Sequence, residues 1–269
     1  IIYLQIIKMR ICKYDKKIWL DSAVGISQYE INMNKTKKLI TIIGELHDLD
    51  FICQAKDVNI SLFEYCESRI AENTKCKILL EYPPDCEDPT RLGSKIIRDT
   101  FNGNTTVRKA TTGIDIRYDF IGMNNISILY HDNTRIPETF EKINNDFIKP
   151  FSLERLDKIC GKPNNEIAIN YCKILSEKFS NLSDIHNKNN NEFILELKWA
   201  WSMVMDYHII NKITKDTNTN EFVIIVGKNH LTNLRTLLNN AKDCKVIVDI
   251  SNKNKSNCVG SHDFRKVCM

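Results

Sequence analysis

The segment GELHD, residues 44–48, places a carboxylate, an imidazole and a second carboxylate directly after an apolar run. Glu45 and His47 are two residues apart, so on an extended segment they point to the same side. A carboxylate and an imidazole can act as a general base with its orienting partner. They also suit borderline divalent metals such as zinc, manganese or iron. The segment therefore predicts a catalytic or metal-binding site.

Similar side chains occur at the ends of three later segments: Glu81 in KILLE, Asp115 and Arg117 in DIR, and Asn229 and His230 in GKNH. Ligands in open α/β sheets bind at the carboxyl ends of strands, where neighbouring loops meet. We therefore expect these side chains to gather with Glu45 and His47 at one edge of a sheet. Glu81 and His230 would add a carboxylate and an imidazole to the metal ligands. Arg117 would hold an anionic group or stabilise a developing oxyanion.

Each of these residues also has a structural explanation when taken alone. Glu45 fits a solvated turn, and His47 or Asp48 fits a cap on the next segment. Glu81 and Arg117 fit an ion pair, and His230 fits the first turn of a surface helix. The functional interpretation depends on all of them sharing one type of position, the end of a strand. The glycines before them, in GELHD and GKNH, would let the backbone approach a ligand closely.

The elements that would position these residues are visible as short apolar runs and helical patterns. The runs predict strands, typical of strands buried on both faces, at 39–43, 77–81, 127–130, 221–226 and 245–250, with a weaker strand and loop at 112–120. Helical patterns cover 60–72, 137–148, 166–179, 191–213 and 231–241. This alternation predicts an α/β fold, a central parallel or mixed sheet flanked by helices, with a mostly helical insertion.

Length and composition predict one α/β domain over 9–251, with a helical lobe inserted at about 137–220 and flexible ends at 1–8 and 252–269. The 42% of hydrophobic residues among 269 is enough for a sizeable core. The net charge of +4 comes from acidic and basic residues that are interleaved, without a basic stripe and spaced aromatics. We therefore expect no nucleic-acid partner.

The cysteines and the apolar segments bear on the cellular compartment. Ten cysteines are scattered singly without a CxxC pair, which predicts reduced thiols and a cytoplasmic location. The opening IIYLQIIK is too short for a membrane span and lacks the layout of a signal peptide. The helix at 191–213 carries a polar stripe, so we expect a core helix and no membrane association. His131, His186, His208 and His262 are expected in loops or in the core.

Taken together, GELHD after a first strand, ILLEYPP, DIR and a late GKNH resemble the erythromycin esterase, ChaN, TraB and Tiki superfamily. That superfamily has a GxxH-type motif in each half of the chain, paired glutamates and an arginine. The resemblance covers roughly 38–117 and 222–250, and implies a central sheet with a pocket built from both halves. It carries over as catalytic residues Glu45, His47, Glu81, Arg117 and His230, and as substrate-binding residues Asp48, Asp115 and Asn229.

The resemblance implies several activities, because members look like metal-dependent peptidases, histidine-dependent esterases or haem-binding proteins. We predict a hydrolase, metal-dependent through Glu45, His47, Glu81 and His230, that cleaves an ester or amide bond of a small molecule or peptide. The alternative is a protein that binds haem or another ligand without catalysis, with His47 or His230 as an axial ligand. A third is a degenerate protein kept for interactions. Motifs for nucleotide binding and for a serine nucleophile elbow are absent from the sequence.

Overall fold

The computed structural model describes residues 18–21, 23–33, 36–45, 58–84, 95–132, 135–137, 139–186, 190–251 and 258–261. The chain forms two compact units. Ile1–Gly113 together with Thr217–Met269 make the first, which we call the α/β unit, and Ile114–Asp216 make the second, the helical unit. The helical insertion expected at about 137–220 corresponds to the helical unit, which already begins at Ile114.

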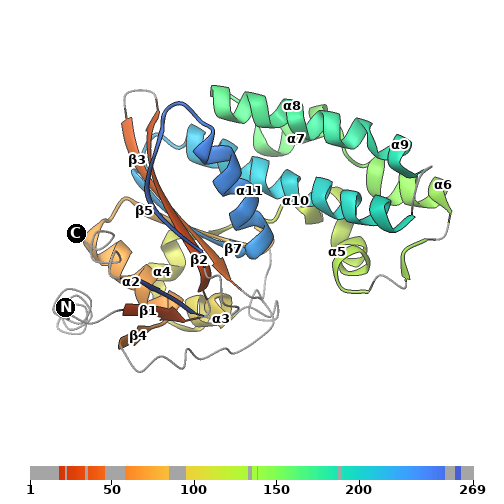
Figure 1. The fold of residues 1–269 in the computed structure, drawn as a ribbon. Helices are drawn as coiled ribbons and strands as arrows, with labels where there is room; N and C mark the ends of the chain where they lie inside the picture. Colours follow the sequence, from red (N-terminus) through yellow and green to blue (C-terminus); the bar gives the residue numbers. More distant parts are fainter. Residues whose placement is uncertain are drawn as a thin grey trace. The chain divides into compact units, whose positions relative to one another are not determined.

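The α/β unit is built on a mixed six-stranded sheet, as the sequence predicted (Figure 1). Its strands are β2 (Ala23–Met33), β3 (Thr36–Glu45), β5 (Cys76–Leu80), β6 (Thr111–Gly113), β7 (Glu221–Gly227) and β8 (Cys244–Ser251). Their order across the sheet is β6-β5-β7-β3-β2-β8. The pairs β6–β5, β5–β7 and β7–β3 are parallel, whereas β2 runs antiparallel to both β3 and β8. The carboxyl ends of β3, β5 and β7 therefore lie at one edge.

Helices cover both faces of this sheet. Helix α11 (Lys228–Asn239) lies on one face, where Tyr29 of β2 donates a hydrogen bond to Asn239 at 3.1 Å. The other face is covered by α2 (Leu62–Glu72), α3 (Lys95–Asn102) and α4 (Thr105–Ala110). Ile26, on the side of β2 opposite Tyr29, belongs to the core cluster on this second face. Central strands with helices on both sides must be apolar throughout, and β7 is buried along its whole length.

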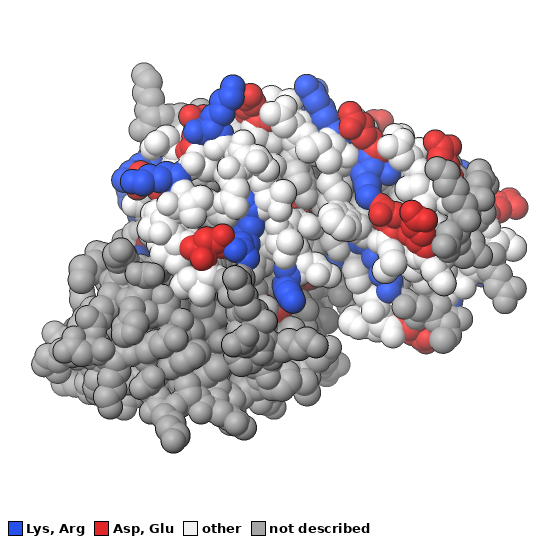
Figure 2. All heavy atoms as spheres, in the orientation of Figure 1, with Lys and Arg blue, Asp and Glu red and all other residues white. Residues whose placement is uncertain are grey.

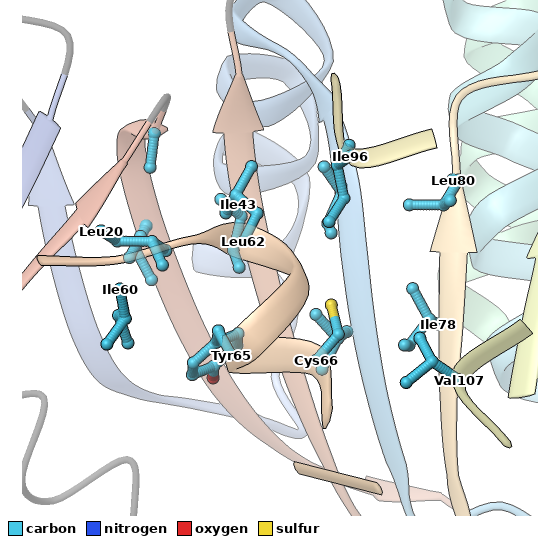
Figure 3. Close-up of a cluster of buried hydrophobic side chains, with 14 of the residues drawn as sticks. Leu20, Ile43, Ile60, Leu62, Tyr65, Cys66, Ile78, Leu80, Ile96 and Val107 are labelled. Atoms are coloured by element: carbon cyan, nitrogen blue, oxygen red, sulfur yellow. The ribbon is translucent and has the colours of Figure 1, made fainter. Parts of the chain in front are cut away.

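The core of the α/β unit lies between the sheet and α2, α3 and α4 (Figure 3). It brings together aliphatic and aromatic side chains from strands and helices: Ile43, Leu62, Tyr65, Cys66, Ile78, Leu80, Ile96 and Val107. Helix α2 begins at this core because Ser61 and Glu64 form a capping box. The Glu64 backbone N–H donates to Ser61 Oγ at 3.1 Å, and the Ser61 N–H donates to Glu64 Oε2 at 2.8 Å.

A second, three-stranded sheet joins segments far apart in the sequence. It consists of β1 (Ile18–Asp21), β4 (Val58–Ile60) and β9 (Cys258–Ser261), in the order β4-β1-β9. Within the end expected to be flexible at 252–269, the residues Cys258–Ser261 form β9, whose backbone pairs antiparallel with β1. The expected flexible residues 1–8, 252–257 and 262–269 lie outside the described residues.

The helical unit contains α5 (Arg117–Tyr130), α6 (Phe140–Ile143), the π-helix η3 (Asn144–Ile148), α7 (Leu153–Cys160), α8 (Glu166–Ser180), α9 (Leu182–His186) and α10 (Asn190–Lys215). Its core centres on Trp201 of α10, whose ring contacts those of Phe120 and Phe179. The Trp201 Nε1–H donates to the Phe147 carbonyl at 2.9 Å, which satisfies its buried donor. A membrane span requires a longer uninterrupted apolar stretch than any helix in the described residues provides.

One strand prediction between 112 and 130 is wrong, because residues 127–130, the run SILY, form the last turn of α5. The weaker strand and loop expected at 112–120 correspond to the strand Thr111–Gly113 and the residues after it, but α5 already begins at Arg117. A short apolar run fits a buried helix as well as a buried strand. Phe120 and Ile121, before the kink at Gly122, and Ile128 and Leu129, after it, are all buried.

Candidate functional site

Three of the predicted site residues lie at one edge of the sheet in the α/β unit. Glu45 is the last residue of β3 and is opposite Gly227, the last residue of β7. Glu81 directly follows β5, whose Leu80 is opposite Ile225 of β7. Helix α11 begins at Lys228 with Gly227 as its N-cap, so His230 lies in its first turn. The carboxyl ends of three parallel strands and a helix N-terminus therefore meet here, as expected.

The Glu81 carboxylate binds His230 directly. His230 Nε2 is 3.2 Å from Glu81 Oε1, and the backbone N–H of Gly227 donates to Glu81 Oε2 at 2.7 Å. The Glu81 backbone N–H donates in turn to the Ile225 carbonyl at 3.2 Å, which fixes the residue on β7. The two side chains are only 11% and 5% exposed. A carboxylate held by a backbone amide and facing an imidazole is the arrangement of an acid–base pair.

The position of Glu81 also suits the charge of a carboxylate. It accepts a hydrogen bond from the N-cap of α11, where the aligned peptide dipoles leave a partial positive charge. Gly227 has no side chain with which to cap this helix, so Glu81 supplies the capping oxygen from another strand. The pairing between Glu81 and His230 therefore follows from the junction of β5, β7 and α11.

Glu45 lies at the same edge but on the other side of β3. Side chains alternate along a strand, and Ile43 belongs to the core cluster beneath α2, whereas Gly44 lies against Leu231 of α11. Glu45 is thus directed to the side of α2, and its charge acts on Cys66 of that helix. The pKa of the Cys66 thiol is raised well above its ordinary value, mainly by burial and further by Cys76 and Glu45. Glu45 is itself only 5% exposed.

Lys228 and Asn229 form the exposed rim of this edge. Both lie in the first turn of α11, and both are solvent-exposed beside the buried His230. Asn229, predicted to bind substrate, is therefore accessible from solvent next to the Glu81–His230 pair. The expected approach of a ligand to the Gly44 backbone is not what the structure shows, because the Leu231 side chain occupies the space next to that residue.

Arg117 and Asp115 belong to the helical unit and bind each other. Arg117 Nε donates to Asp115 Oδ1 at 2.7 Å, and Nη2 donates to Oδ2 at 2.6 Å, a bidentate pair. Both side chains are buried, at 6% and 4% exposure, and the guanidinium lies 4.9 Å from the centre of the Tyr130 ring. These contacts give Arg117 a structural role at the start of α5.

The two remaining predicted site residues, His47 and Asp48, lie outside the described residues. Within the described residues, no three His, Cys, Asp or Glu side chains are close enough together to hold a metal ion. Of the four predicted metal ligands, Glu45, His47, Glu81 and His230, His47 lies outside the described residues. Metal binding and haem binding by this site therefore stay predictions.

A second histidine with a close side-chain partner lies in the helical unit. His208 of α10 lies near Cys160, the last residue of α7. His208 Nδ1 is 3.3 Å from Cys160 Sγ. Burial, followed by the charges of Lys212 and Lys215, lowers the pKa of His208 to about 4. Burial raises the pKa of the Cys160 thiol to about 12. The sequence placed His208 in a core helix, but its partner is 48 residues away, and no motif links the two.

The surface of the described residues has no single dominant charge on the face shown in Figure 2, where basic side chains lie beside acidic ones. One hollow of about 680 Å³ lies in the helical unit and is lined by Asp119, Ser152, Glu154, Arg155, Lys158 and Ile159. None of these is a predicted site residue. The interleaved charge that the sequence showed is therefore also visible on this face.

The chain matches no protein-family model, no curated protein and no solved structure. The similarity to the erythromycin esterase, ChaN, TraB and Tiki superfamily is therefore carried by the four short motifs alone. Any function for the strand-end site has to be argued from its own residues.

Proposed function

We propose that this chain is a hydrolase of an ester or amide bond, in which Glu81 and His230 form the acid–base pair. The observation that supports this proposal is the 3.2 Å contact between His230 Nε2 and Glu81 Oε1 at the carboxyl edge of the sheet. The motif resemblance to the erythromycin esterase, ChaN, TraB and Tiki superfamily points to the same edge. Small molecules and peptides are the substrates that the resemblance favours.

In the proposed mechanism His230 removes a proton from the attacking water. The imidazolium that forms is stabilised by Glu81, whose second oxygen is kept in place by the Gly227 N–H. His230 then returns the proton to the leaving group. A neighbouring carboxylate orients the imidazole and disperses its charge, which is the role that an acid plays beside a catalytic histidine in other hydrolases. Burial of the pair keeps water from weakening this interaction.

The motifs imply a metal site, and the described side chains show whether they could form one. Both oxygens of Glu81 are bonded within the protein, one to the His230 ring and one to the Gly227 N–H. Among the described side chains no group of three suitable donors is formed. These residues by themselves do not fit a metal site, so no step of the mechanism passes through one. A site for zinc, manganese or iron would need His47, and that prediction is tested by metal analysis.

The cytoplasm is the compartment that we propose for this enzyme. Support comes from the thiols, because a cytoplasmic protein keeps its cysteines reduced. The cysteines that the structure records as free, within the described residues, are Cys66, Cys76, Cys160, Cys172 and Cys244.

The experiment that tests the hydrolase is a panel of chromogenic esters and fluorogenic peptides with purified protein. Wild type should cleave at least one of them, and Glu81→Gln should lower kcat by about 10²-fold or more, since the His230 imidazolium then lacks the carboxylate that orients and stabilises it. Glu45→Gln is assayed together with metal analysis of the same sample. Loss of metal together with activity would assign Glu45 as a metal ligand, whereas loss of activity alone would contradict the assignment of His230 as the base.

The control for this panel is a histidine outside the site. His208→Ala removes an imidazole of the helical unit and should leave every rate of the panel at the wild-type value. A wild type that cleaves none of the substrates, or a Glu81→Gln variant as fast as wild type, would contradict the proposal. Haem added to wild type and to His230→Ala tests the alternative: a visible absorption band that is present in wild type and lost in His230→Ala would favour ligand binding.

A further inference from the structure

Gly44 of β3 lies in direct contact with Leu231 of α11. A Cβ atom placed on Gly44 would be 2.7 Å from Leu231 Cδ2, 3.2 Å from its Cβ and 3.5 Å from its Cγ. Leu231 is 2% exposed and is held among the strands that α11 covers, so its side chain has little room to rotate. Helix α11 therefore packs directly against the backbone of Gly44 through the Leu231 side chain.

The contact controls the distance between α11 and the sheet near the helix N-terminus. The Leu231 Cδ2 atom is the end of a flexible side chain, but its Cβ is fixed to the helix backbone. A residue with a side chain at position 44 must therefore displace the helix itself by a few tenths of an ångström. The residue beside Leu231 in the helix is His230, so a shift of the helix moves the imidazole too.

The Glu81–His230 contact is sensitive to such a shift. At 3.2 Å it is already at the long end of the hydrogen-bond range, and a contact near 3.6 Å is no longer a hydrogen bond. Glu81 is held by β7 at two points: its backbone N–H donates to Ile225, and its Oε2 accepts from Gly227, the last residue of that strand. A displacement of α11 away from β3 would separate the imidazole from the carboxylate.

We propose that Gly44 is a positioning residue: it sets the distance between α11 and β3, and thereby the distance between His230 and Glu81. The hydrolase proposed above depends on this second distance. Gly44 does not touch the reacting atoms. It acts through Leu231, and the glycine of GELHD is needed because any Cβ at this position would lift the helix. The role of this glycine is thus contact with a helix, in place of the contact with a ligand that its position at a strand end predicts.

The test is Gly44→Ala, examined by nitrogen NMR of the histidine rings as well as by activity. The His230 resonance is assigned by its loss in His230→Ala, which is practical because the chain has six histidines. In Gly44→Ala the ring resonance of His230 should shift toward that of an imidazole without a carboxylate partner. kcat should fall about 10- to 100-fold with KM little changed, because small misplacements of catalytic groups have effects of this size.

The double variant Gly44→Ala/Leu231→Gly identifies the contact responsible. Removing Leu231 Cβ, Cγ and Cδ2 eliminates all three contacts, at 3.2 Å, 3.5 Å and 2.7 Å. The double variant should recover the His230 resonance and much of kcat, although each single substitution impairs them. A Gly44→Ala protein that is folded and has the wild-type His230 resonance would overturn the proposal, as would a double variant no better than Gly44→Ala.

A second comparison applies if Gly44→Ala does not fold. Leu231→Ala and Leu238→Ala each remove a buried leucine of α11, but only the first touches Gly44. Leu231→Ala should shift the His230 resonance and Leu238→Ala should not, and equal shifts would overturn the proposal. The NMR measurement does not depend on hydrolysis. Gly44 can therefore be shown to position His230 even when no substrate is cleaved, an outcome that would contradict only the hydrolase.

Discussion

Two histidines, one in each unit of the chain, have opposite surroundings. His230 lies in the first turn of α11 against the Glu81 carboxylate, at the edge where three parallel strands end. His208 lies within α10 near the Cys160 thiol, with Lys212 and Lys215 close enough to lower its pKa further. His230 is buried, and His208 is partly buried. A carboxylate can stabilise an imidazolium, whereas burial and the charges of two lysines oppose its formation.

The difference shows that burial of a histidine does not by itself indicate a catalytic role. The pKa of His208 is lowered to about 4, so its ring is neutral at pH 7 and cannot act as a general acid there. Its neighbour Cys160 has a pKa raised to about 12, which keeps the thiol protonated and unreactive. His230 has an anionic partner that is anchored by the backbone of β7. Of the two histidines, only His230 has surroundings suited to proton transfer.

The largest expected effect is on kcat/KM, when the imidazole of His230 is removed and that of His208 serves as the comparison. His230→Ala should lower kcat/KM about 10²- to 10⁴-fold on any substrate that the wild type hydrolyses, the range for a general acid–base group. His208→Ala should leave it unchanged. Steady-state kinetics of both variants beside wild type measure this. Equal losses in the two variants would mean that the comparison between the histidines does not separate catalysis from structure.

The sequence predicted the positions of the candidate residues in the sheet of the α/β unit better than those in the helical unit. The runs around Ile43, Leu80 and Val226 identified three parallel strands, because central strands must be apolar on both faces. Once those strands were in place, Glu45, Glu81 and His230 followed at one edge. Strand β2 was not found, because its buried Ser27 and Gln28 interrupt the apolar pattern that identifies a central strand.

Arg117 shows why a motif can be detected while the contact it makes is not. Its spacing from Asp115 is the same in a strand-end site and in a local ion pair, so the sequence does not distinguish the two. In the structure the guanidinium binds Asp115 on both of its acceptor oxygens and also the Tyr130 ring. Tyr130 itself was assigned to a strand, and only the fold of α5 brings it to Arg117. Long-range packing of this kind leaves no local pattern.

A second prediction compares the two carboxylate pairs by stability. Asp115→Asn leaves the Arg117 guanidinium buried beside a neutral amide, and should lower the free energy of unfolding by about 3 kcal/mol or more, as for other broken buried pairs. Glu81→Gln should lower it less, because the amide oxygen still accepts the Gly227 N–H. Urea denaturation followed by circular dichroism measures both. The double variant Asp115→Asn/Arg117→Met should recover stability, and no recovery would contradict a paired role for Arg117.

A third prediction uses the pH dependence of stability. The folded pKa of His208, about 4, is below the ordinary value of 6.5, so between these values the unfolded chain binds a proton that the folded chain does not. The stability of the folded state therefore falls as pH decreases from about 6.5 to 4. The contribution is at most about 3.5 kcal/mol, from roughly 1.4 kcal/mol for each pKa unit.

The variant that tests this is His208→Gln, which cannot take up the proton. Its stability should decline less than that of wild type between pH 7 and pH 4, as measured by urea denaturation at several pH values. His131→Gln provides the control, because His131 is exposed and its replacement should leave the decline as it is in wild type. Parallel curves for wild type and His208→Gln would show that His208 is not the buried group that the structure describes.

The smallest expected effect concerns the Cys160 thiol. Cys160→Ala removes the sulfur near His208 Nδ1 but keeps the Cys160 backbone carbonyl, which accepts hydrogen bonds from Asn211 at 2.9 Å and Lys215 at 3.0 Å. The free energy of unfolding should fall by about 1 kcal/mol, the usual contribution of one hydrogen bond, and hydrolysis should be unaffected. Asn211→Ala removes the amide that donates to the same carbonyl, and should lower the free energy of unfolding by more than Cys160→Ala does. If Cys160→Ala instead abolished hydrolysis with its stability intact, the catalytic histidine pair would be the one in the helical unit.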